Sequence, residues 1–165
     1  MPPLKLTIVI CTHNRSSLLM KTISSLNAAQ RPYNCDLSIL VIANACRDET
    51  SECLQGYIAQ QKDTLTIPLR YREEPRPGKS HALNLALKKI RDGYINFVDD
   101  DHRVDPQYLS AISDAIRKSP TCPSFCGRII PDWTGHEPSW VHTTGQYRLY
   151  PIQSVVQAGG KGGIA

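Results

Sequence analysis

The chain has 165 residues, enough for one domain with a sizeable hydrophobic core, and its 41% hydrophobic and 21% charged residues exclude a largely disordered protein. Its net charge of +4 is small and the basic residues are scattered, which argues against nucleic acid as a partner. No segment has the length and hydrophobicity of a transmembrane helix, and the polar N-terminus does not resemble a signal peptide.

Strands and helices are predicted to alternate along most of the chain. Apolar or β-branched runs bounded by polar turns predict strands at residues 6–10, 37–42, 65–71 and 94–98, with one more at 127–130. Helical periodicity predicts helices that begin near residues 16, 50, 80 and 106. This alternation indicates an α/β fold, a mainly parallel sheet with helices on both faces.

Single residues add detail to the third and fourth predicted strands and to the helices that follow them. Pro68 favours an edge position for the third strand, and Ser80 is the predicted N-cap of the helix after it. The fourth strand is expected to be short and buried. Asp105 is the predicted N-cap of the last helix, with Pro106 as its first residue.

Three consecutive carboxylates, Asp99, Asp100 and Asp101, lie between the fourth strand and its helix. Ligands bind at this end of the strands in open α/β sheets. Adjacent carboxylates repel one another, and a divalent cation shared with substrate phosphates would relieve that repulsion. A solvated acidic turn is the alternative interpretation.

The six cysteines show no zinc-ligand spacing. We therefore expect free thiols in a reducing cytoplasm, with Cys11 and Cys46 not joined by a disulfide.

Four short stretches, each at a predicted strand–loop–helix junction, resemble family 2 glycosyltransferases, inverting enzymes with a GT-A (Rossmann-like) fold. They are TIVICTHNR at 7–15, VIANACRDET at 41–50, PGKSHALN at 77–84 and FVDDD at 97–101. The resemblance covers about the first 130 residues and implies a domain at 1–130 that binds a nucleotide-diphosphate sugar, the donor.

The resemblance also implies roles for the acidic turn. Asp99 and Asp101 match the Asp-x-Asp motif of the family. Asp101 would bind Mn²⁺ or Mg²⁺ at the diphosphate, and Asp99 would meet the ribose or the water shell of the metal. Asp100 would either contact the nucleotide or point to solvent, and His102 is a candidate auxiliary ligand.

Further donor contacts are implied at the other junctions. The implied donor-binding residues, besides Asp99 and Asp100, are Thr12, Asn14, Arg15, Asn44, Gly78 and Lys79. Asn44 would hydrogen-bond the base, although many family members carry Asp where this chain has Ala43. Two alternatives stay open: Asn14 caps the first helix, and Asp48 caps the second helix instead of contacting the ligand.

Residues 131–165 resemble the start of a truncated acceptor-side region. No catalytic base can be assigned there, and no Gln-x-x-Arg-Trp motif is present. The late candidates for the base are Asp132, His136, Glu137 and His142.

The resemblance predicts metal-dependent transfer of a sugar to an acceptor hydroxyl, with inversion. The acceptor is unknown and would be a saccharide, lipid or protein; a lipid acceptor would bring the protein to a membrane surface. One alternative is a nucleotide-sugar-binding module or fragment without efficient transfer, as expected if the chain is complete at residue 165. Another is a nucleotidyltransferase, although no Gly-rich fingerprint follows the first strand.

Overall fold

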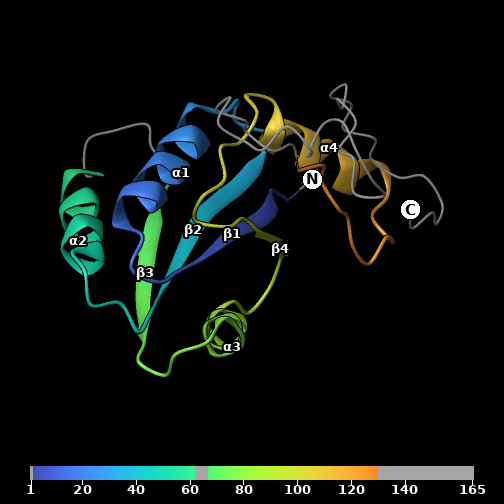
Figure 1. The fold of residues 1–165 in the computed structure, drawn as a ribbon. Coiled ribbons are helices and arrows are strands. Elements are labelled where there is room, and N and C mark those ends of the chain that lie inside the picture. Colours follow the sequence, from blue (N-terminus) through green and yellow to red (C-terminus); the bar gives the residue numbers. More distant parts are fainter. Residues whose placement is uncertain (1, 62–66, 130–165) are drawn as a thin grey trace, which may run out of the picture. The chain divides into compact units, whose positions relative to one another are not determined.

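The structure, a computed structural model, describes residues 2–61 and 67–129 (Figure 1). Strands and helices alternate in these ranges. The strands are β1 (Leu4–Thr12), β2 (Cys35–Asn44), β3 (Leu69–Glu74) and β4 (Tyr94–Phe97). The helices are α1 (Ser16–Ala28), α2 (Thr50–Gln60), α3 (Lys79–Lys89) and α4 (Tyr108–Lys118).

The strands form a parallel sheet in the order β3-β2-β1-β4. The longest pairing joins β1 to β2, from Leu4 opposite Cys35 to Thr12 opposite Ala43. This architecture confirms the predicted α/β fold, a parallel sheet with helices on both faces. Because all four strands run in the same direction, the loops that follow them meet along one edge of the sheet.

Two hydrophobic clusters cover the two faces of this sheet. On one face, Ile8 and Ile10 of β1 pack in a cluster with Leu19 and Ile23 of α1, and Leu54 of α2 belongs to it as well. The other face carries Val9, Leu40 and Ile42 against Ala82 and Ala86 of α3. Figure 1 shows α1 and α2 on one side of the strands and α3 on the other.

The sheet corrects two strand predictions. The third strand begins at Leu69 and continues to Glu74, because hydrogen bonding to β2 carries it through charged residues that suggested a loop. Residues 65 and 66 lie outside the described part. In the described sheet β3 is an outermost strand and pairs with β2, which confirms the prediction that the third strand lies at an edge. The fourth strand is not fully buried: β4 pairs with β1 alone in the described sheet, and Phe97 is 54% exposed.

Helix starts also differ from the predictions. Helix α3 begins at Lys79 with Gly78 as N-cap, so Ser80 lies in its first turn. Helix α4 begins at Tyr108, two residues late, although the Asp105 carboxylate accepts the N–H of Gln107 as a capping residue would. Residues 127–129 form no strand, and residue 130 lies outside the described ranges.

The chain divides into two compact units, Met1–Ser113 and Asp114–Ala165. The sheet and the cleft described below belong to the first unit. The predicted boundary between residues 130 and 131 lies outside the described part of the chain and stays a prediction.

All six cysteines fall within the described ranges, and none is in a disulfide, as predicted for Cys11 and Cys46. In these ranges no helix is both long enough and apolar enough to cross a membrane.

Candidate functional site

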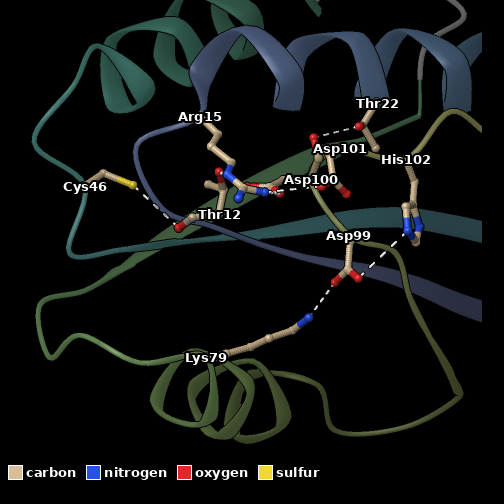
Figure 2. Close-up of polar contacts among 9 residues, drawn as sticks. All are labelled: Thr12, Arg15, Thr22, Cys46, Lys79, Asp99, Asp100, Asp101 and His102. Carbon is tan, nitrogen blue, oxygen red and sulfur yellow. Dashed lines mark hydrogen bonds and ion pairs between the residues drawn. The ribbon is translucent and has the colours of Figure 1, made fainter. Parts of the chain in front are cut away.

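A polar cleft of about 320 Å³ lies where β1, β2 and β4 end. It is lined by Cys11, Thr12, His13, Arg15, Asn44, Lys79, Asp99, Asp100 and Asp101. Seven of these nine were predicted from the sequence as donor or metal contacts. Residues far apart in the chain therefore meet here: the bond between Thr12 and Asp100 joins residues separated by 88 positions. Figure 2 shows the acidic turn with Thr12, Arg15 and Lys79, and Lys79 reaches from α3 toward the turn.

Asp100 is the buried member of the acidic turn and anchors it. Its side chain is 9% exposed; one carboxylate oxygen accepts the Thr12 hydroxyl at 2.7 Å, and the other lies 3.3 Å from Arg15 Nη1. The backbone carbonyl of Asp100 accepts the Thr22 hydroxyl from α1 at 2.9 Å. The alternative that Asp100 points to solvent is wrong, because these three contacts hold the turn against β1 and α1 (Figure 2).

Asp99 and Asp101, in contrast, are about half exposed and paired with cations. Asp99 accepts Lys79 Nζ at 2.6 Å, and Asp101 lies 3.3 Å from Arg15 Nη1. The hydrogen bond from Lys79 lowers the pKa of Asp99 against the opposing effect of burial, and the same bond raises the pKa of Lys79. His102 Nε2 is 3.9 Å from Asp99, at the limit of an ion pair. The cleft thus presents paired opposite charges.

The two cations come from the starts of two helices. Arg15 is the N-cap residue of α1, and Lys79 is the first residue of α3. Unpaired N–H groups and the helix dipole make such ends favourable for anions. Each of the two helices begins a few residues after a strand ends at this edge, so the fold gathers positive charge beside the acidic turn.

Asn14 and Asp48 join neighbouring loops instead of lining the cleft. Asn14 does not cap α1: with φ of 53°, it accepts the N–H of Arg47 at 2.7 Å. Asp48 accepts the N–H and hydroxyl of Thr50 at the start of α2, and its other oxygen accepts the N–H of Ser16. The N-cap residue of α2 is Glu49, so the prediction that Asp48 caps this helix is wrong by one residue, although its carboxylate accepts hydrogen bonds at the starts of both α1 and α2. Although burial opposes ionisation, these hydrogen bonds keep its pKa below the ordinary value.

Asn44 ends β2, is 5% exposed, and directs its side-chain amide at the loop before α3. It donates to the carbonyls of Glu74 and Arg76 and accepts the N–H of Gly78. Gly78 does not line the cleft; with φ of 124°, it turns the chain into α3 and sets the position of Lys79.

Cys11 and His13 line the cleft but were not predicted as contacts. His13 Nδ1 lies 2.6 Å from the carbonyl of Asn44, and burial raises the pKa of the Cys11 thiol to about 11. The sequence feature that could have identified them as cleft residues is their position, because both flank Thr12 at the end of β1. By residue type alone, Cys11 suggested the interior of a strand and His13 suggested a loop.

A divalent cation is compatible with these residues. Asp99 and Asp101 lie beside the cleft with side chains 49% and 47% exposed. Across the residues that the structure describes, no group of three or more His, Cys, Asp or Glu residues is arranged to hold a metal ion by itself. Mg²⁺ is usually bound by one or two carboxylates together with substrate phosphates, so this donor set fits such an ion.

Fold and cleft together define a class: α/β proteins whose parallel sheet brings carboxylates and cations together at its carboxyl edge. The sequence model described as Glycosyl transferase family 2 matches residues 7–162. The chain belongs to glycosyltransferase family 2.

Relatives are distant and longer. An "Uncharacterized glycosyltransferase MG060 homolog" of Mycoplasma pneumoniae is 24% identical over 116 residues, which cover 70% of this chain and 38% of that protein. A mannosyltransferase of Pyrobaculum calidifontis, solved with GDP-Man and Mn²⁺, has a TM-score of 0.60 at 22% identity, over 74% of this chain and 34% of its own.

TarS of S. aureus, residues 1–349 solved with UDP-GlcNAc, has a TM-score of 0.58 at 20% identity, over 78% of this chain and 37% of its own. Likenesses at this identity show the fold, which is GT-A-like. This chain spans little more than a third of the length of these three proteins.

Proposed function

We propose that the cleft binds a nucleotide-diphosphate sugar and that the protein takes part in transferring the sugar to an acceptor hydroxyl. The observation that carries this proposal is the pairing of Asp99 with Lys79 and of Asp101 with Arg15 at the edge where the strands end. A diphosphate requires cations, and a metal bound to that diphosphate requires carboxylates. The cleft offers both within a few ångströms.

The cations would meet the diphosphate. Arg15 can contact phosphate oxygens with its planar guanidinium, and Lys79 can act as a point charge at the start of α3. Both side chains are more than half exposed, so an anion can reach them. Lys79 is paired with the exposed Asp99, and Arg15 with the exposed Asp101 and the buried Asp100. Exposed ion pairs are typically worth no more than about 1 kcal/mol, so exchange of Asp99 and Asp101 for a phosphate costs little.

A divalent ion, Mn²⁺ or Mg²⁺, would be held by Asp101, with Asp99 at its water shell or at the ribose. Such an ion neutralises the charge that grows on a departing diphosphate. Support comes from the exposure of the two carboxylates and from the Mn²⁺ in the mannosyltransferase structure. Asp100 would contribute by holding the turn, because its own oxygens are bonded to Thr12 and Arg15.

The transfer itself would be a single displacement with inversion. A base would take the proton of the acceptor hydroxyl, the hydroxyl oxygen would bond to the anomeric carbon, and the bond to the diphosphate would break. Asp132, His136, Glu137 and His142, the candidates for this base, lie outside the described residues. The acceptor would be a saccharide, lipid or protein. A lipid acceptor would bring the protein to a membrane surface.

A donor-binding module without efficient transfer is the second candidate. The observation that favours it is that the three carboxylates lining the cleft in the described residues are Asp99 and Asp101, which the proposal assigns to the metal and the donor, and Asp100, which holds the turn, so none of them is left for an acceptor-side base. In either case we propose a cytoplasmic protein, since all six cysteines are free thiols.

Turnover distinguishes these candidates. The protein is incubated with UDP-, GDP- and other nucleotide sugars, Mn²⁺ or Mg²⁺, and candidate acceptors. Nucleotide release is measured together with the anomeric configuration of the product by NMR. We expect metal-dependent release and, when an acceptor is used, an inverted product. Tight donor binding without product supports the module, and a retained configuration would contradict the proposed displacement.

A further inference from the structure

Asn44 makes a fixed set of three hydrogen bonds to one loop. Its Nδ2 donates to the Arg76 carbonyl at 2.7 Å and to the Glu74 carbonyl at 3.2 Å, and its Oδ1 accepts the Gly78 N–H at 2.8 Å. Carbonyls only accept and an N–H only donates, so the opposite orientation of the amide would break all three bonds. Both amide protons of a side chain 5% exposed are therefore in use.

The segment that Asn44 holds is residues 75–78, here called the arm, which joins β3 to α3. A second set of contacts fixes the same arm. The Glu74 carboxylate accepts the backbone N–H of Arg76 at 3.0 Å and its guanidinium at 2.9 and 3.0 Å. The Glu74 carbonyl also accepts the N–H of Ala45 at 2.8 Å. The arm is thus restrained at its beginning and its end.

The arm ends next to Lys79, one of the two cations of the cleft. Gly78 is the N-cap of α3, and the next residue, Lys79, places Nζ 2.6 Å from Asp99. The backbone carbonyl of Asn44 meets His13 Nδ1 at 2.6 Å on the opposite side. Asn44 therefore connects the end of β1 to the start of α3.

From these contacts we infer that Asn44 is a positioning residue for diphosphate binding, which it controls through the arm and Lys79. The inference rests on the proposed function. A residue that reads the base needs free polar atoms, whereas the amide protons of Asn44 are bound within the chain. Loss of these bonds is expected to move Gly78 and Lys79 and to weaken every ligand that carries a diphosphate, whatever its base.

The test uses Asn44→Asp, which keeps the acceptor for Gly78 and removes both donors. Affinities for Mg²⁺-pyrophosphate, UDP, GDP, CDP and ADP are measured by titration calorimetry for the wild type, Asn44→Asp, Lys79→Met and the double variant. Asn27→Asp is the matched control, because the Asn27 amide also makes three bonds, to Ile23, Tyr57 and Ile67, near the other end of α1.

We expect Asn44→Asp to weaken all five ligands by a similar factor of about ten, from two lost hydrogen bonds, with no effect of Asn27→Asp. The double variant should be no weaker than Lys79→Met alone, since both changes act through the same cation. A change in preference among the bases, unequal effects on pyrophosphate and nucleotides, or additive losses would overturn the inference.

Hydrogen exchange separates failure of this inference from failure of the proposed function. In Asn44→Asp we expect faster exchange at the backbone amides of Arg76, Gly78, Lys79 and Ser80, with β1 still protected as evidence of folding. An arm as protected as in the wild type would overturn the inference whatever the ligand results. A wild type that binds neither pyrophosphate nor any nucleotide would refute the proposed function, and the inference with it.

Discussion

Three adjacent aspartates differ in environment, and this difference organises the site at the scale of single residues. Asp100 is buried and bonded to Thr12 and Arg15, whereas Asp99 and Asp101 stay about half exposed and paired with cations. A buried carboxylate needs partners that compensate its lost hydration, and exposed ones can exchange theirs. The turn can therefore be rigid while two of its carboxylates remain available to a ligand.

The bond between Thr12 and Asp100 provides the first prediction. Thr12→Val leaves one oxygen of a buried carboxylate without its donor, which should cost about 1–3 kcal/mol of unfolding free energy. Thr12→Ser keeps the hydroxyl and should cost clearly less. Urea denaturation of the three proteins measures the difference, and equal stabilities of the valine and serine variants would show that this bond contributes nothing.

Glu74 gives a prediction about pH. Its hydrogen bonds from the Arg76 side chain and backbone lower its pKa from the ordinary 4.5 to about 2. A carboxyl group whose pKa is lower in the folded state stabilises the fold above its unfolded pKa. That contribution is lost as pH falls from about 4.5 toward about 2.

Denaturation of the wild type should therefore become easier across that window, and Glu74→Gln should depend less steeply on pH there. Identical pH profiles for wild type and Glu74→Gln would contradict the assigned bond. Glu73→Gln, a change of the exposed neighbouring glutamate, serves as the control.

At the scale of elements, the site is built from junctions where a parallel strand ends and a helix begins. Helix α3 shows how packing determines the placement of one of them. It packs on the sheet through Ala82 and Ala86, both fully buried, while Leu87 is 48% exposed. Small side chains let the helix approach the sheet closely, so Lys79 starts it beside the acidic turn.

Gly78 is the backbone feature on which this junction depends. Its φ of 124° is rarely adopted by residues with a side chain, although a Cβ would meet only His81 Cδ2 at an ordinary 3.6 Å. Gly78→Ala should therefore cost about 1–3 kcal/mol through the backbone and weaken diphosphate binding.

Gly56→Ala is the matched control, because Gly56 lies inside α2 with open space around it. Alanine there should stabilise the protein by about 0.5–1 kcal/mol. Thermal and urea denaturation measure both variants. A Gly78→Ala protein as stable as the wild type would show that this conformation is not required.

At the scale of the whole molecule, the topology followed from the sequence better than the contacts did. Apolar runs and helical periodicity predicted the alternation of strands and helices, because burial on both faces of a parallel sheet leaves a strong pattern. The ends of the strands were harder to predict. Hydrogen bonding to β2 extends β3 through Arg72 and Glu74, although charged residues of this kind suggest a loop.

The membership of the cleft could be predicted, but the partners of its residues could not. Position after a strand placed the acidic turn at the edge where ligands bind, and the resemblance to family 2 glycosyltransferases added Thr12 and Lys79. Which aspartate is buried depends on where Thr12 and Arg15 lie in three dimensions. For the same reason Asn44 suggested a base contact, whereas its amide is bonded to a loop some 30 residues away.

The most direct test of the central claim, that this cleft binds a metal and a diphosphate together, is calorimetric titration of UDP and GDP with and without Mn²⁺. Asp101→Asn is compared with Asp92→Asn, which changes an exposed aspartate that pairs with Lys5 at 2.6 Å. We predict that Mn²⁺ strengthens binding to wild type and Asp92→Asn by about tenfold or more, and that Asp101→Asn loses most of this gain. Equal affinities with and without Mn²⁺, or the same gain in Asp101→Asn, would contradict the claim.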